Sequence, residues 1–160
     1  MTQVSTMPSN ARLWVYQSNR FFSDAEVKAI ETAGSNFISD WAAHGASLKA
    51  SFDVLYNCFI VIAVDEQQAI ASGCSIDKSV KFVKELETQM NLNLFDRMQV
   101  AYRTADEIKI CKLSDFEKLA TQKLINESTI VFNNMVSSKA TFDTDWQVPL
   151  KQSWQSRVLA

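Results

Sequence analysis

The sharpest candidate for chemistry in this chain is Cys74, within the stretch AIASGCSIDKSV at residues 69–80. The stretch leads from an apolar run into an amphipathic segment, so we expect the thiol in the first turn of a helix. Oriented backbone amides and the helix dipole favour the thiolate there, and Lys78, about one turn further on, adds to that effect. Asp77 opposes it, and a cysteine that follows a glycine often packs as a small apolar group. A reactive thiol and a packed side chain are therefore the two alternatives for Cys74.

The neighbours of Cys74 extend this candidate site. Gly73 allows close approach of a ligand to the backbone, and Ser72 and Ser75 present hydroxyl groups to the same side. Together with the thiol and the two charged side chains, they form the floor of a hypothetical ligand pocket.

A Cys-His nucleophile pair would need His44, because the chain has only one histidine. His44 precedes Gly45 near the end of an expected helix, where a cation interacts favourably with the helix C-terminus. We also expect the end of that helix and the start of the Cys74 helix to lie at opposite ends of a sheet. A capping role for His44 is therefore favoured over catalysis.

Asp65 and Glu66 follow the apolar run of residues 58–64 and resemble carboxylates at the carboxyl edge of a sheet, where ligands commonly bind in α/β folds. With one histidine and no H-x-E or D-x-D spacing they make a poor metal site. A solvated strand end is the favoured interpretation, and we expect no metal and no cofactor.

Asp96, Arg97 and Arg103 flank a later expected strand. Paired with Asp65 or Glu66, they could form an ion-pair network or an anion site, and the structural network is the favoured alternative.

Hydrophobic periodicity predicts the elements that must position these residues. Ser23 to Glu26 has the form of a capping box at the start of a helix that runs to Gly45, and residues 114–117 have the same form before a short third helix. The expected segments up to residue 102 are a strand at 12–17, that first helix, strands at 47–56 and 58–64, a helix from the Cys74 turn to Met90, and a strand at 98–102.

This order matches an α+β fold with a split βαβ (ferredoxin-like) core, in which the first and third strands are central and two helices cover one face. The alternative is another mixed α+β sheet with helices on both faces. Residues 1–11 are expected to be a flexible leader, and residues 12–160 a single domain. Residues 140–158 carry too many apolar side chains to lie in water, so we expect them to dock as a C-terminal strap.

Composition excludes several classes of protein. The formal net charge of −2 provides no basic field for nucleic acid, and the longest apolar run has seven residues, whereas a membrane-spanning helix needs about 20. Three cysteines without a CxxC pair fit reduced thiols better than disulfides. We therefore expect a cytoplasmic protein that binds neither nucleic acid nor membranes.

The chain resembles a family of small uncharacterised bacterial proteins, many of them labelled "ABC transporter ATPase". The resemblance is carried by WVYQSNR (14–20), WAAHG (41–45), VDE (64–66), ASGCSIDKSV (71–80), FDRMQVAYR (95–103) and the W…P…SW…R pattern from Trp146 to Arg157. It implies no established activity.

The label conflicts with the residues. A Walker loop needs the run G-x-x-x-x-G-K-[ST], because its glycines let backbone amides approach the phosphates and its lysine neutralises them. The only glycines are Gly34, Gly45 and Gly73, and none precedes a lysine. We therefore expect no ATPase activity.

Two functions from different classes follow. The favoured one is a non-catalytic protein-interaction module that binds an unidentified protein or its own copy as a homodimer, because no nucleophile, base and orienting group match one another. Trp14, Tyr16, Trp41, Trp146 and Trp154 are candidates for its partner surface. The alternative is a thiol-dependent or small-ligand-binding enzyme centred on Cys74.

Overall fold

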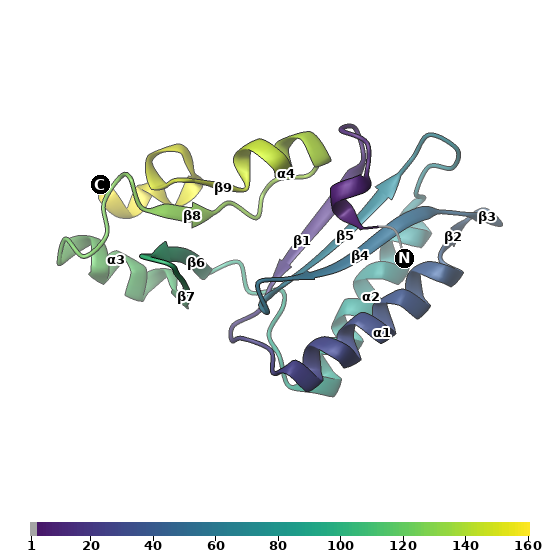
Figure 1. Ribbon diagram of the computed structural model, residues 1–160, viewed down its shortest axis with the longest axis horizontal. Helices are drawn as coiled ribbons and strands as arrows, with labels where there is room; N and C mark the ends of the chain where they lie inside the picture. The colour runs from purple at the N-terminus through teal and green to yellow at the C-terminus, as the bar shows by residue number, and fades with distance from the viewer. Residues whose placement is uncertain (1–2) are drawn as a thin grey trace.

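The computed structural model describes residues 3–160 and shows an α+β protein built on antiparallel sheets. The sheet of the first half of the chain and that of the second half lie beside each other along the long axis of the molecule (Figure 1). The elements are η1 Val4–Thr6, β1 Arg12–Gln17, α1 Asp24–Asp40, β2 Ala42–Ala43, β3 Ala46–Ser47, β4 Lys49–Leu55, β5 Phe59–Asp65, α2 Gly73–Met90, β6 Gln99–Thr104, β7 Glu107–Lys112, α3 Leu113–Thr121, β8 Ile130–Phe132, α4 Lys139–Asp145, β9 Gln147–Pro149, η2 Leu150–Gln152 and η3 Trp154–Leu159.

The first sheet has the order β1-β5-β4, and both pairings are antiparallel. All seven residues of β5 are buried, as expected for an apolar central strand covered on both faces. Helices α1 and α2 cover one face (Figure 1), and the predicted capping box fixes the start of α1: Glu26 N–H donates to the Ser23 hydroxyl, and Ser23 N–H donates to Glu26.

Helix α1 lies unusually close to this sheet at Gly34. A Cβ atom at this position would stand 2.1 Å from the ring of Phe52, a fully buried side chain of β4. Only glycine lets the helix backbone rest on the aromatic ring, which in turn packs edge-on against Phe82 of α2. The contact links both helices to the sheet.

The strand that was expected to complete the first sheet does not pair with β1. After α2 the chain crosses the end of β1, where Asn19 N–H donates to the Asn93 carbonyl and Asn93 N–H donates to the Asn19 side chain. Strand β6 then joins a second sheet in the order β7-β6-β8-β9. The first sheet therefore has β1 at its edge.

The second sheet and the segments around it pack on the other face of the first sheet. Trp146 stands at the centre of this layer, with its ring 5.0 Å from Phe59 of β5 and 5.0 Å from Phe132 of β8. Residues 3–11 were expected to belong to a flexible leader, but Val4, Met7 and Ala11 are buried in the same cluster. Residues 1–2 lie outside the described residues.

The C-terminal segment, expected as an extended strap, folds into α4, β9, η2 and η3. Strand β9 pairs with β8, and Val148 and Leu150 are buried. Pro149 stands on an edge strand, where its missing N–H costs no ladder hydrogen bond.

Two further expectations about helix ends are corrected. Helix α1 ends at Asp40, so His44 does not cap it; His44 is an exposed residue with φ 50° in the β2–β3 hairpin turn. Helix α3 begins at Leu113 without a side-chain cap, so residues 114–117 form no capping box.

The end of α1 and the start of α2 were expected to lie at opposite ends of the sheet, but they are in contact. The indole of Trp41 at the end of α1 donates to the Ser75 carbonyl in the first turn of α2, at 2.8 Å. The two helices are antiparallel because each returns along the sheet from an antiparallel strand, so the end of the first lies beside the start of the second.

Candidate functional site

The hydroxyl groups predicted beside Cys74 serve the start of α2. Ser72 is the N-cap and accepts from Ser75 N–H, and the buried Ser75 hydroxyl donates to the Ser72 carbonyl at 2.8 Å. Both serines are therefore engaged in capping the helix.

The other predicted site residues lie on the helix surface. Cys74, Gly73, Asp77 and Lys78 are exposed, and a Cβ atom at Gly73 would meet nothing within 4 Å. None of them lines the cleft described below. The structure thus brings the predicted residues together on one helical turn, but on an open surface.

We expect Cys74→Ser to change the free energy of unfolding by less than about 0.5 kcal/mol, because the side chain is exposed and α2 keeps its Ser72 cap. Urea unfolding measures this change.

We also expect Cys74 to be alkylated first among the three free cysteines. Burial raises the pKa of Cys58 to about 12 and that of Cys111 to about 11, so both remain protonated thiols at neutral pH. Mass-resolved iodoacetamide labelling measures the order of alkylation. Labelling of Cys58 before Cys74 in the native protein would contradict this order.

The charged strand end is structural. The Glu66 carboxylate accepts from Ala71 N–H at 2.8 Å, and Asp65 accepts from Gln67 N–H and lies 3.6 Å from the Lys49 ammonium. These contacts fold the loop before α2, so both carboxylates have partners. Among residues 3–160, no three histidine, cysteine or carboxylate side chains are grouped so that they could hold a metal ion.

Asp96, Arg97 and Arg103 do not form the favoured network. Arg103 donates to Gln147 at 2.8 Å and lies over the rings of Tyr56 and Phe132. Asp96, by contrast, lies with Arg97 at the mouth of a cleft beside β1.

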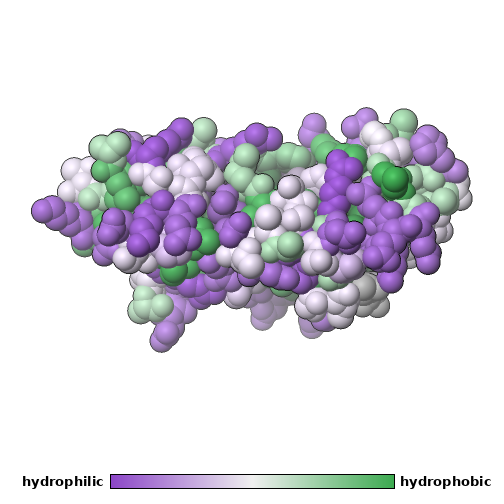
Figure 2. All heavy atoms as spheres, turned by 90° about the horizontal axis from the view of Figure 1, so that it is seen from above, coloured by the Kyte–Doolittle hydropathy of each residue, from purple (hydrophilic) through white to green (hydrophobic). Residues whose placement is uncertain are grey.

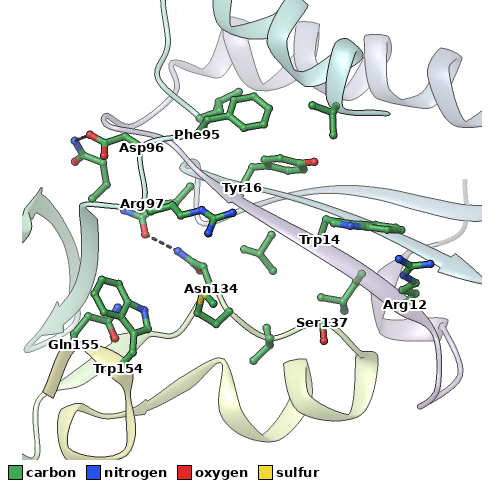
Figure 3. A pocket seen from close by; sticks show the side chains of 18 residues that line it. Arg12, Trp14, Tyr16, Phe95, Asp96, Arg97, Asn134, Ser137, Trp154 and Gln155 are labelled. Atoms are coloured by element: carbon green, nitrogen blue, oxygen red, sulfur yellow. Dashed lines mark hydrogen bonds between the residues drawn. The ribbon is translucent and has the colours of Figure 1, made fainter. Parts of the chain in front are cut away.

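This cleft has a volume of about 480 Å³, which is within the usual range for binding sites. Figure 3 shows Trp14 and Tyr16 on one side of β1, with Phe95 close to Tyr16, and Asn134 and Ser137 on the other side. Trp154 and Gln155 form the far wall, and the guanidinium of Arg97 reaches into the space between (Figure 3). The cleft therefore combines aromatic walls with a cation.

The edge of β1 that faces the cleft carries unpaired backbone groups. Ser18 N–H points toward β5 and donates to the Cys58 carbonyl. Leu13 N–H points away from β5 and donates to the Ser137 carbonyl. Direction alternates along an antiparallel strand, so the N–H and C=O of Val15 and the N–H of Gln17 point outward. Within residues 3–160 these groups have no hydrogen-bond partner. The edge is covered at Leu13 and again at Asn19, and is open between them.

The side chains of Gln17, Asn134 and Trp146 form a hydrogen-bonded chain, and the first two of these residues line the cleft. Asn134 donates to the Gln17 side-chain oxygen at 2.8 Å and accepts from the indole of Trp146 at 2.9 Å. Gln17 is only 6% exposed, yet its Nε2 has no partner within residues 3–160. An unpaired buried donor costs roughly 1–3 kcal/mol of stability.

Exposed apolar side chains border the cleft. Phe95 and Met135, both lining the cleft, and the nearby Met98 are exposed. On the face seen in Figure 2, hydrophobic residues form small patches separated by hydrophilic ones. Exposed aromatic and methionine side chains around an open strand edge are typical of an interaction site.

Of the five aromatic residues predicted as partner-surface candidates, Trp14, Tyr16 and Trp154 line the cleft, as does Arg97, the anion candidate. Trp41 and Trp146 are instead buried in the core, so they are not part of a surface. Sequence reasoning missed Gln17 and Asn134, because two uncharged polar residues far apart in the sequence give no local signal.

No protein-family model, curated protein or solved structure matches the chain. Within residues 3–160, no helix combines the length and the apolar character needed to cross a membrane.

Proposed function

We propose that this protein is a non-catalytic interaction module that takes an extended segment of a partner protein against the free edge of β1. The observation that carries this proposal is the open stretch of β1 between Leu13 and Asn19, whose outward backbone groups face the cleft. A strand added there would pair those groups, while the walls of the cleft would receive its side chains.

The other sheet edges carry features that discourage pairing. Lys49 and Asp53 lie on β4, and β9 contains Pro149. Strand β7 has Glu107, Lys109 and Lys112 along its six residues. Charged residues and proline on edge strands prevent association, whereas β1 has no charged residue between positions 13 and 17. The unprotected edge is the one that faces the cleft.

We further propose that residues 12–90 form a ferredoxin-like split βαβ unit whose fourth strand comes from the partner. The order β1-β5-β4 with α1 and α2 on one face supports this reading, since a fourth strand would lie beside β1 in that plan. The place beside β1 is instead bordered by residues 134–137 and 94–97.

The length of the open edge sets the size of the segment. From Leu13 to Asn19 the strand extends by roughly 20 Å, at about 3.3 Å per residue. A peptide of about five or six extended residues fits that length. Residues 137–139 already pair antiparallel with β1 at its start, so the partner segment would continue along the same line.

The test uses a short capped peptide of alternating valine and threonine, titrated into isotopically labelled protein and followed by amide NMR. We expect shifts at Val15, at Gln17 and in segments 94–97 and 134–137, and none at the Cys74 turn. The matched control is the same peptide with alternate N-methylated residues, which keeps its side chains but loses main-chain donors.

We expect the N-methylated peptide to bind at least about tenfold more weakly, because the added strand depends on main-chain hydrogen bonds. Equal binding of both peptides, or no shifts with either, would overturn strand addition. A sedimentation mass that doubles with protein concentration and is lost in Val15→Pro would identify a second copy as the occupant.

A further inference from the structure

We infer that the partner segment is acidic and presents a carboxylate to Arg97. This inference rests on the function proposed above and names the chemistry of the segment that the cleft selects.

Arg97 is the first reason. It is exposed, it lines the cleft, and within residues 3–160 it makes no hydrogen bond and no ion pair. Arg20 and Arg103, by contrast, donate to Glu26 and Gln147. A guanidinium that reaches into a cleft without a partner is suited to a carboxylate, which it binds through two parallel hydrogen bonds.

The charge of the cleft is the second reason. Its charged lining residues are Arg12, Arg97 and Asp96, which sum to +1 in a chain whose formal net charge is −2. Both oxygens of the Asp96 carboxylate are engaged, one by Met98 N–H and the other by the Gln99 side chain. Arg12 lies over the ring of Trp14, 3.9 Å from Glu66. The charged residues that line the cleft therefore sum to a small positive excess, and Arg97 is the one of the three whose side chain has no partner within residues 3–160.

The test compares three capped peptides that share one alternating valine-threonine frame and differ at a single central position, which is aspartate, asparagine or lysine. We expect the aspartate peptide to bind about tenfold more tightly than the asparagine peptide, and the lysine peptide to bind weakest. Raising the salt concentration should narrow the difference.

Two variants locate the effect. Arg97→Gln should weaken the aspartate peptide about tenfold and leave the asparagine peptide unchanged. Lys28→Gln removes the same charge from an exposed position of α1 outside the cleft and should change neither.

The outcomes separate the two proposals. Equal binding of the three peptides, with NMR shifts still at Val15, would overturn the acidic preference and leave strand addition standing. An aspartate preference that survives in Arg97→Gln would also overturn it. Absence of shifts at Val15 with all three would overturn both.

Discussion

Replacing Trp146 by alanine is expected to lower the free energy of unfolding by about 4 kcal/mol, in the range found for buried tryptophan and phenylalanine truncations. The indole is 4% exposed and contacts Phe59 and Phe132, one from each large sheet. Its removal leaves a cavity between the two sheets and takes a hydrogen-bond donor from Asn134. Urea unfolding followed by circular dichroism measures the loss.

Trp154→Ala is the matched control, because Trp154 is only half-buried and its ring faces Arg157. We expect it to cost less than half as much as the change at Trp146. Equal losses for the two variants would contradict the central position assigned to Trp146 between the sheets.

The second large effect is expected at Gly34. An added methyl group would collide with the fully buried ring of Phe52, and overpacking of this kind costs roughly 1–3 kcal/mol. The gain in helix propensity from glycine to alanine offsets about 1 kcal/mol. Because a 2.1 Å approach is severe, we expect a net loss of about 2 kcal/mol in Gly34→Ala.

Gly73→Ala is the matched control, because it makes the same substitution at a helical position where the added methyl group meets no neighbour. Its Cβ atom meets nothing within 4 Å, so the variant should be neutral or more stable by up to about 1 kcal/mol. If Gly34→Ala proves as stable as Gly73→Ala, α1 does not rest on Phe52 as described.

Strong periodicity made the first half of the fold predictable. The alternation before residue 56, the continuous apolar run of β5 and the spacing along α1 and α2 each correspond to an observed element. Helix ends were harder to predict: a helical spacing of apolar residues reached Trp41, but the left-handed His44 and Gly45 belong to a hairpin turn that has its own strands.

The pairing of β6 could not be read from the sequence. Its pattern fits an edge strand beside β1 as well as the inner strand that it forms between β7 and β8. The choice depends on the path of residues 91–98 past β1 and on the packing of Ala101 against the other face of the first sheet. The cleft exists because of that choice. The sequence could therefore indicate single lining residues such as Arg97, but not the open edge that brings them together.

Amide hydrogen exchange of β1, measured residue by residue, reports directly on whether its edge is open. In the free protein, the outward N–H of Val15 should exchange faster than the inward N–H groups of Trp14 and Tyr16, which pair with β5. Saturation with the aspartate peptide should slow exchange at Val15 at least about tenfold while Trp14 and Tyr16 stay unchanged. Protection of Val15 equal to that of its neighbours in the free protein, or exchange at Val15 that the bound peptide does not slow, would contradict an open edge that receives a partner strand.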